Sequence, residues 1–358
     1  MRRRVWLLAC VVLGVAAVAK GATVWVDLGP IWAPDTGKIS LPSVIVDPAR
    51  FGEGGSDPDQ APLYKMYYSD GAYPECDEIH LAVSPDGVTW QLVGPVLYGA
   101  KRPAVVYSAA GFGSGDSKYM IWYTIASDEA QRQQTGSFKV CRSADGVTWS
   151  EPEACTSADP ARPLLASGTS PEDQNAWNRG SYGILRAFFN PQGAATVTLE
   201  APMSNRYVMY YNVYGADAVS AQEGGLDVTS SIAMAVSADG VAWSRVGDAP
   251  VLRGWPSVTG GMISFADIVK QADHYELCFM VESNPTEGYI RRIGQAASTD
   301  GASWTVTSQD IAVLKTDDGE KGTYGLSMAV DPNNGELLIW LAAGDGPDRE
   351  VIKLGRQE

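Results

Sequence analysis

The chain has 358 residues, of which 45% are hydrophobic, and its formal net charge at pH 7 is −15. A surface this acidic repels nucleic acid and anionic lipid, so we exclude both as partners. The 38 Gly and 21 Pro make the chain rich in turn formers, which favours an all-β architecture in one large domain or two ordinary ones.

Residues 1–19 have the pattern of a secretory signal peptide. Three arginines follow Met1, the stretch 5–18 is nearly all apolar, and Ala17-Val18-Ala19 is a small-x-small cleavage pattern. Interpreting Leu7-Leu8-Ala9-Cys10 as a lipoprotein signal instead leaves most of the apolar stretch unused. We therefore expect a secreted or periplasmic protein, and no later stretch is long and apolar enough to span a bilayer.

Short aromatic or aliphatic runs, separated by turn residues, predict strands along the rest of the chain. In chain order these runs are 25–32, 43–46, 64–68, 79–84, 90–97, 119–123, 207–211, 275–279, 326–330, 337–341 and 350–354. In each unit an inner run, an aromatic run and a third run come before a turn of the same kind, and a fourth run comes after that turn. The repeating unit therefore has four strands.

Four of the turns share the pattern Ser-x-Asp-Gly-x-x-Trp, at Ser84–Trp90, Ser143–Trp149, Ser237–Trp243 and Ser298–Trp304. Asp-Gly provides the positive-φ residue and the side-chain-to-backbone bonds of a tight hairpin, and the Trp can pack back over the turn. The pattern recurs about every 60 residues, apart from an insertion of about 35 residues around 157–181 and 214–231. This period is typical of four-stranded propeller blades.

A fifth unit begins with the runs 326–330 and 337–341, but the chain ends before its outermost strand. The N-terminus can supply that strand, because Trp25, Gly29 and Pro30 have the same spacing as Trp90, Gly94 and Pro95. Closing the ring in this way pairs strand edges that would otherwise be bare. We therefore predict an all-β fold, a five-bladed β-propeller closed by an N-terminal strand, formed by residues 20–358 as a single domain and a monomer.

The order of these motifs resembles the five-bladed glycosidase propellers of the arabinanase/β-xylosidase and invertase/levansucrase clan, as in the run Ile79–Trp90. The resemblance covers essentially the whole mature chain. The turns are also similar to sialidase Asp-boxes, which carry one more residue between Asp and Gly. The resemblance implies a carbohydrate ligand and a secreted glycoside hydrolase acting on a poly- or oligosaccharide.

The clan uses three inward carboxylates, one of them an Asp directly before the Pro of the first inner strand. Leu41 stands before Pro42 here, and the second blade has Arg102 before Pro103. Hydrolysis needs two carboxyl groups across the scissile bond. This departure leaves open an alternative function, a non-catalytic propeller that binds glycan or protein through the same face.

Counting back from the first hairpin of each blade gives five equivalent positions that are expected to face the axis. They are Ser43, Ala104, Arg186, Asp267 and Ser327. Opposite charges in adjacent blades have two interpretations, a ligand-contacting pair or a structural ion pair between blades. Asp267 is one candidate catalytic carboxylate, and Glu282, at the end of its strand, is the preferred acid.

Strand alternation places the Asp-Gly turns on one face, where all loops are expected to be short, and the long loops on the opposite face. Carboxylates and aromatic residues in long loops are the usual functional groups of a propeller. Trp177 and Tyr182 are candidates for stacking on a sugar, with capping of the core as the alternative. The remaining binding candidates are Arg102, Arg186, Asn178, Arg179, Asp70 and Tyr289.

Metal and thiol chemistry have few candidates. With only His80 and His274, both in strand patterns, a multi-histidine zinc site is excluded, and we expect no cofactor. The segment 317–320 offers carboxylates for calcium, but it lacks an EF-hand pattern. Cys141 and Cys155 flank one hairpin and are the first candidates for a disulfide, and four unpaired thiols are the alternative.

Overall fold

The computed structural model describes residues 24–34, 39–53, 61–71, 76–113, 115–125, 138–165, 178, 180–216, 228–254, 262–282, 291–311, 314, 323–344 and 350–357. The proposed signal peptide at 1–19 and the candidate calcium segment at 317–320 lie outside these ranges. No helix in the described part of the chain is long and apolar enough to cross a membrane.

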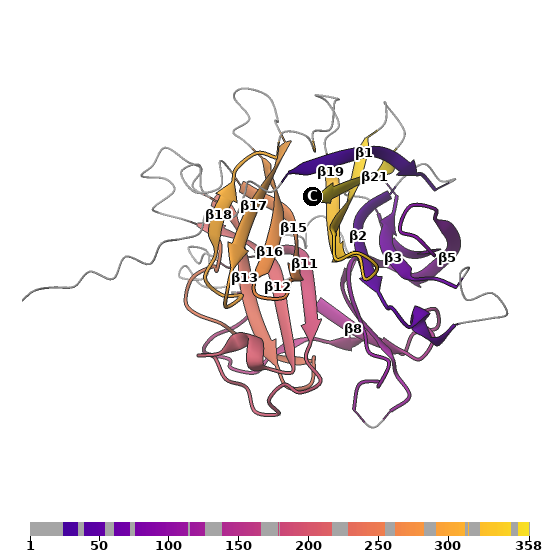
Figure 1. Cartoon of the computed structure of the whole chain (residues 1–358). Coiled ribbons are helices and arrows are strands. Elements are labelled where there is room, and N and C mark those ends of the chain that lie inside the picture. The colour runs from indigo at the N-terminus through magenta and orange to yellow at the C-terminus, as the bar shows by residue number, and fades with distance from the viewer. Residues whose placement is uncertain are drawn as a thin grey trace, which may run out of the picture.

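Most of the secondary structure is β-strand, in five sheets that form the blades of a five-bladed propeller (Figure 1). The first blade consists of β2 (Ile39–Val46), β3 (Tyr64–Asp70), β4 (Glu78–Ser84) and β5 (Gln91–Tyr98). The second consists of β6 (Ala100–Tyr107), β7 (Tyr119–Ile125), β8 (Phe138–Ser143) and β9 (Glu153–Ala154). The third consists of β11 (Gly180–Phe189), β12 (Tyr207–Ala216), β13 (Val228–Ser237) and β14 (Ala242–Arg245).

The fourth blade consists of β15 (Met262–Lys270), β16 (Tyr275–Glu282), β17 (Arg291–Ser298) and β18 (Thr305–Ser308). The fifth combines β19 (Thr323–Val330), β20 (Leu337–Gly344) and β21 (Glu350–Gln357) with β1 (Trp25–Trp32). A short strand, β10 (Thr156–Ser157), pairs in parallel with β14, so the chain crosses to the outer edge of the third blade before it enters β11. The predicted fold class is confirmed.

The ring is closed by pairing of the first and last strands, as the sequence predicts. β1 lies antiparallel to β21, with Trp25 opposite Gln357 (Figure 1). The shared Gly-Pro spacing marks the same irregularity in two outer strands, because Gly29 and Gly94 both have positive φ, at 78° and 129°. Only glycine adopts such angles without steric cost, so the alignment of the two segments reflects backbone geometry.

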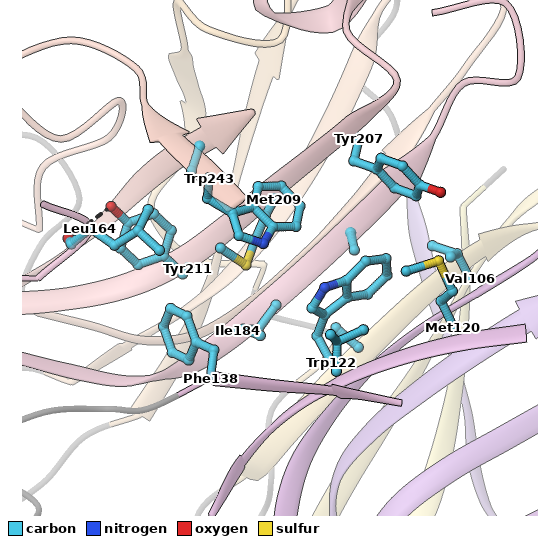
Figure 2. Close-up of a cluster of buried hydrophobic side chains, with 14 of the residues drawn as sticks. Val106, Met120, Trp122, Phe138, Leu164, Ile184, Tyr207, Met209, Tyr211 and Trp243 are labelled. Carbon is cyan, nitrogen blue, oxygen red and sulfur yellow. Dashed lines mark hydrogen bonds between the residues drawn. The ribbon is translucent and has the colours of Figure 1, made fainter. Parts of the chain in front are cut away.

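Most of the hydrophobic core is divided among the five seams between adjacent blades, and a smaller cluster of Leu41, Cys76, Phe265 and Met280 lies at the axis. One cluster of buried side chains joins each pair of neighbours, and Figure 2 shows the cluster between the second and third blades, where Trp122, Met209 and Trp243 lie together. Because every blade is buried on both sides, its second strand is buried at almost every position and is mostly apolar or aromatic.

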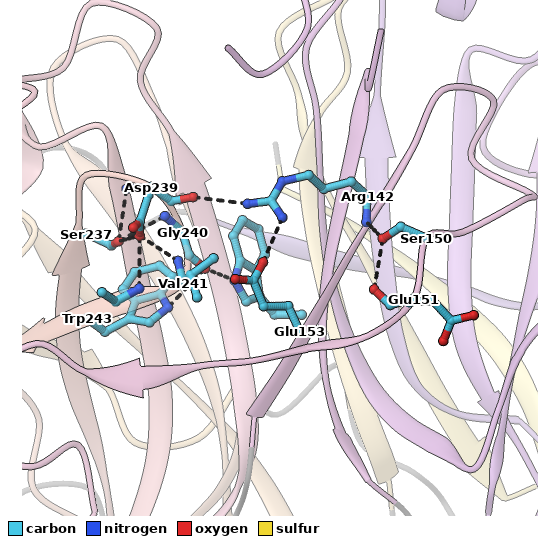
Figure 3. A network of polar contacts seen from close by, with 11 residues as sticks. Arg142, Ser150, Glu151, Glu153, Ser237, Asp239, Gly240, Val241 and Trp243 are labelled. Atoms are coloured by element: carbon cyan, nitrogen blue, oxygen red, sulfur yellow. Dashed lines mark hydrogen bonds and ion pairs between the residues drawn. The ribbon is translucent and has the colours of Figure 1, made fainter. Parts of the chain in front are cut away.

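Each Ser-x-Asp-Gly turn is held by its own side chains. In the second blade the Oδ1 atom of Asp145 accepts hydrogen bonds from the N–H groups of Val147 and Thr148 at 2.8 Å, and Ser143 Oγ accepts one from Gly146 N. Figure 3 shows the equivalent turn at Asp239, where Arg142 of the neighbouring blade reaches the Asp239 carbonyl oxygen. The predicted turn chemistry is confirmed.

The turns also fasten neighbouring blades together. The fourth residue of an aromatic strand donates a hydrogen bond to the glycine carbonyl of the next blade's turn: Tyr67 to Gly146, Trp122 to Gly240, Tyr210 to Gly301 and Trp340 to Gly87. The fifth equivalent position is Cys278, and the blade after it, closed by β1, has no such turn. Tyr or Trp therefore stands at this position where the glycine carbonyl of the next blade's turn can accept a hydrogen bond, and Cys stands where the next blade has no such turn.

Two expectations need correction. The turn face does not carry only short loops, because the first hairpins of blades one and three extend over 47–63 and 190–206 and contain 3-10 turns at Arg50–Gly52 and Pro202–Ser204. The pairing of Cys141 with Cys155 is also wrong, since the four described cysteines are free thiols. Cys141 is buried and lies 3.8 Å from the Tyr123 hydroxyl.

Candidate functional site

The two ends of the propeller differ in what they can present to a ligand. The Asp-Gly turns and the first hairpin of each blade lie at one end. The connections between second and third strands lie at the other end, called here the long-loop end, and each contains residues outside the described ranges. The described part of a site at this end is therefore its floor, made by the innermost strands.

A small pocket on the axis is lined by all five innermost strands. Each contributes at least one residue, among them Leu41, Arg102, Gly183, Phe265 and Gly325. The cavity measures about 30 Å³, which is room for about one or two water molecules and not for a sugar ring. A carbohydrate would therefore have to bind above this pocket, at the long-loop end.

Every innermost strand is irregular beside the pocket. Pairing with the second strand shifts between Ser40 and Ser43 in β2 and between Lys101 and Ala104 in β6, and β11, β15 and β19 shift at equivalent places. Leu41 and Arg102 adopt positive φ angles of 53° and 59°, which are costly for residues with a side chain. Irregular pairing in all five innermost strands, with strained backbone in two of them, indicates that the surroundings of this pocket are maintained by the fold.

The neighbouring blades are shaped to receive these two residues. A Cβ atom on Gly183 would lie 2.4 Å from the Arg102 Cδ atom, and one on Gly325 would lie 2.7 Å from the Leu41 Cα atom. Glycine in blades three and five therefore provides the space that Arg102 and Leu41 occupy. The Arg102 guanidinium lies 5.7 Å from the centre of the Phe265 ring, within the range of a cation–π contact.

The five predicted axial positions are equivalent in the structure. Ser43, Ala104, Arg186, Asp267 and Ser327 each pair with the fourth residue of the second strand. Three of them accept a hydrogen bond from a backbone N–H of the following blade: Ser43 from Val105, Ser327 from Val44 and Asp267 from Met328. This level of the axis therefore joins blades together.

Asp267 is saturated with hydrogen-bond donors. Its Oδ2 atom accepts bonds from Met328 N at 2.7 Å, Ser327 Oγ at 2.9 Å and Arg186 Nη1 at 3.3 Å, and its Oδ1 atom accepts one from Ile268 N. Burial raises the pKa of Asp267 above its usual value, although Arg186 and the other donors act in the opposite direction. A carboxylate held this fully is suited to positioning Arg186, which also lies over the Phe188 ring at 5.6 Å.

Several predicted site residues fall wholly or partly outside the described residues. Glu282 ends β16 opposite Met262 and Arg291, which places its backbone at the long-loop end. Its side chain and that of Tyr182 are not described, and Trp177, Arg179 and Tyr289 lie outside the described residues. None of the described residues that line the axial pocket carries a carboxyl group.

Asn178 and Asp70 have their own local partners. Asn178 is 3% exposed, and its side-chain amide donates hydrogen bonds to the carbonyl oxygens of Pro163 and Leu164. Asp70 ends β3 directly opposite Glu78, and the His80 imidazole contacts both carboxylates. Asn178 thus faces the protein interior, whereas Asp70 belongs to a three-residue cluster.

Sequence reasoning missed Phe265, Gly183 and the partners of Asp70. Phe265 and Gly183 acquire their roles from contacts between blades, which no local pattern reveals. Glu78 and His80 had a usable signal, because two hairpin strands joined after Asp70 place alternate side chains on one face. Using that signal requires the register in which these two strands pair, and the length of the loop between them does not fix that register.

Comparison with known proteins gives the fold and no family. No family model and no curated protein matches the sequence. A solved glycoside hydrolase is 19% identical with a TM-score of 0.63, covering 92% of this chain and 91% of that one. A thermostable family-43 glycoside hydrolase is 17% identical with a TM-score of 0.55, covering 91% and 92%.

An N-acetylgalactosamine deacetylase from F. plautii, solved in complex with blood group B trisaccharide, is 15% identical with a TM-score of 0.50 and 94% coverage of both chains. At these identities the likeness shows the fold alone. The resemblance to five-bladed glycosidase propellers is thereby confirmed as a resemblance of fold.

Proposed function

We propose that this protein is exported and binds a carbohydrate over the axial pocket, at the long-loop end of the propeller. The observation that carries the proposal is the conformation of Arg102. Its backbone is held at a φ of 59° and its side chain fills the space left by Gly183 beside Phe265. Strain of this kind persists where the surrounding structure maintains it, and it is concentrated at ligand-binding sites.

The residues around the axial pocket suit a polyhydroxylated ligand. Arg102 provides guanidinium donors for sugar hydroxyl groups or an anionic substituent, and Phe265 provides an apolar ring. Arg186 follows Leu185 of the pocket wall, and its ion pair with Asp267 holds that wall to the fourth blade. Trp177, Arg179, Tyr182 and Tyr289 are proposed to extend the contact from the loops.

The test is a glycan-array screen of the mature protein, followed by titration of a hit into variants. Arg102→Gly removes the side chain and relieves the backbone, so we expect a small change in melting temperature and a loss of affinity of about tenfold or more. Arg142→Ala, on the turn face, is the matched control. Equal affinity of wild type and Arg102→Gly for every hit would refute the proposed site.

Glycoside hydrolysis is the second candidate function. It is favoured by the position of Glu282 at the strand end and by hydrolases among the proteins of this fold. In this mechanism Glu282 would protonate the leaving oxygen, and a second carboxylate would attack or activate water. Release of reducing ends by wild type, lost in Glu282→Gln, would support it; binding without any release would leave the binding function alone.

A further inference from the structure

A second cluster of chemistry-bearing side chains lies at the long-loop end of the first blade, away from the axis. Asp70 and Glu78 are opposite each other on β3 and β4, and Tyr68 is opposite His80. Because alternate residues of paired strands share a face, all four side chains lie on one side of the sheet. That side packs against the fifth blade, since Tyr68 shares a core cluster with Trp340 and Ile352.

The three ionisable groups converge on one point. One ligand atom from each lies within 4.8 Å of the other two. His80 Nε2 is 2.9 Å from Glu78 Oε2 and 3.9 Å from Asp70 Oδ2. Ligands of one small divalent cation are separated by about 3–3.5 Å, given metal–ligand bonds of about 2.0–2.2 Å. Small side-chain shifts would therefore bring all three onto one ion.

The three side chains differ in how far they are buried. The exposed side-chain fraction is 8% for His80, 16% for Asp70 and 36% for Glu78. The cluster is therefore closed on the side of the blade seam and reachable from solvent at Glu78. An ion could enter from that side without opening the core.

A buried polar atom beside the cluster points independently to a ligand. Tyr68 is 0% exposed, and within the described part of the chain its hydroxyl has no hydrogen-bond partner. The Tyr68 ring lies beside the cluster, with its centre 5.7 Å from the centre of the His80 ring. Buried hydroxyl groups are normally satisfied, and a water molecule on a bound ion would satisfy this one.

We propose that Asp70, Glu78 and His80 bind a divalent transition-metal cation of the zinc class at the seam between the first and fifth blades. One imidazole and two carboxylates suit Zn²⁺, whereas calcium and magnesium prefer all-oxygen sites. The site is independent of the proposed carbohydrate site. The metal site lies beside contacts that join the first and fifth blades. Ile39 N donates a hydrogen bond to Glu350 Oε2 at 2.9 Å, and the Trp32 ring packs edge-on against the Tyr68 ring.

The chain contains its own control. His274, the only other histidine, also contacts two carboxylates, Asp273 at 2.7 Å and Glu276 at 3.1 Å. These contacts are made by opposite ring nitrogens, Nδ1 and Nε2, so the two carboxylates cannot join the imidazole around one ion. His274→Gln therefore removes an equally paired histidine without removing the proposed site.

The experiment is calorimetric titration of Zn²⁺ into the untagged mature protein after dialysis against a chelator. We expect one Zn²⁺ per chain, an affinity at least about tenfold lower in Glu78→Gln and His80→Gln, and no change in His274→Gln. Glu78 is partly exposed, so Glu78→Gln should fold even if His80→Gln does not. Zn²⁺ should also raise the melting temperature of wild type and not of Glu78→Gln.

Three results would overturn the proposal. They are no bound Zn²⁺, equal Zn²⁺ affinity in wild type and Glu78→Gln, and equal affinity of the wild type for Ca²⁺ and Zn²⁺.

Discussion

Asp267 and Asp145 are both surrounded by hydrogen-bond donors, but the pKa of the first carboxyl group rises on folding and that of the second falls. Asp267 is 2% exposed, and burial outweighs Arg186 and the other donors. Partial burial also acts to raise the pKa of Asp145, but the N–H groups of Thr148 and Val147 and nearby hydroxyl groups lower it to about 2. The difference in solvent access explains why folding raises the pKa of Asp267 and lowers that of Asp145.

The Asp267→Asn variant tests the positioning role of Asp267. Asparagine keeps the shape but has one acceptor oxygen in place of two, so donors that now bond to both oxygens of Asp267 lose a partner and the free energy of unfolding should fall by about 1–3 kcal/mol. Urea denaturation beside Asp116→Asn, an exposed aspartate, measures the loss. An Asp267→Asn protein with the wild-type midpoint would show that the hydrogen bonds to Asp267 do not hold these blades together.

The lowered pKa of Asp145 predicts acid sensitivity with a definite sign. A carboxyl group with a folded-state pKa below its unfolded value of about 3.8 stabilises the fold above that pH. The contribution disappears as the pH falls towards 2. Asp145→Ala should therefore lose about 1–2 kcal/mol at pH 7 and much less near pH 2. Urea midpoints at both pH values give the comparison, and an equal loss at each would contradict the assignment.

At the scale of elements, hydrogen bonds from one blade to the next blade's turn explain why the fourth residue of four aromatic strands is Tyr or Trp. Tyr210 donates to the Gly301 carbonyl, which also accepts a bond from Trp304. We expect Tyr210→Phe to lower the free energy of unfolding by about 1 kcal/mol, since the carbonyl keeps one donor. Tyr68→Phe, tested in metal-free buffer, removes a buried hydroxyl that has no hydrogen-bond partner among the described residues, and it should cost less. Equal losses in thermal unfolding would rule out a role for the bond between blades.

Strands and turns could be predicted from the sequence because their signals are local. Ser143, Asp145 and Gly146 specify one turn through bonds within a few residues, and the same pattern occurs four times. The bulge at Arg102 could not be predicted, because it depends on Gly183 in the next blade. The cluster around His80 was missed for a related reason, since it depends on the register in which β3 pairs with β4, which the number of residues between the two strands does not fix.

At the scale of the whole molecule, closure by β1 connects both ends of the chain to one sheet. Trp25 is 4% exposed and belongs to the core cluster between the fourth and fifth blades. Deleting residues 20–32 should expose the edge of β21 and abolish the single cooperative unfolding transition. Deleting residues 20–23 alone is the control. If the longer deletion melts like the full mature chain, closure by β1 does not stabilise the ring.

The central claim, that a carbohydrate binds over the axial pocket, is tested most directly by hydrogen–deuterium exchange with and without the glycan selected on the array. We predict protection of the innermost strands beside the pocket, at 100–104, 183–187 and 263–267. The turns at 84–90, 143–149 and 237–243 should exchange at unchanged rates. Protection confined to these turns, with none at the innermost strands, would contradict the account.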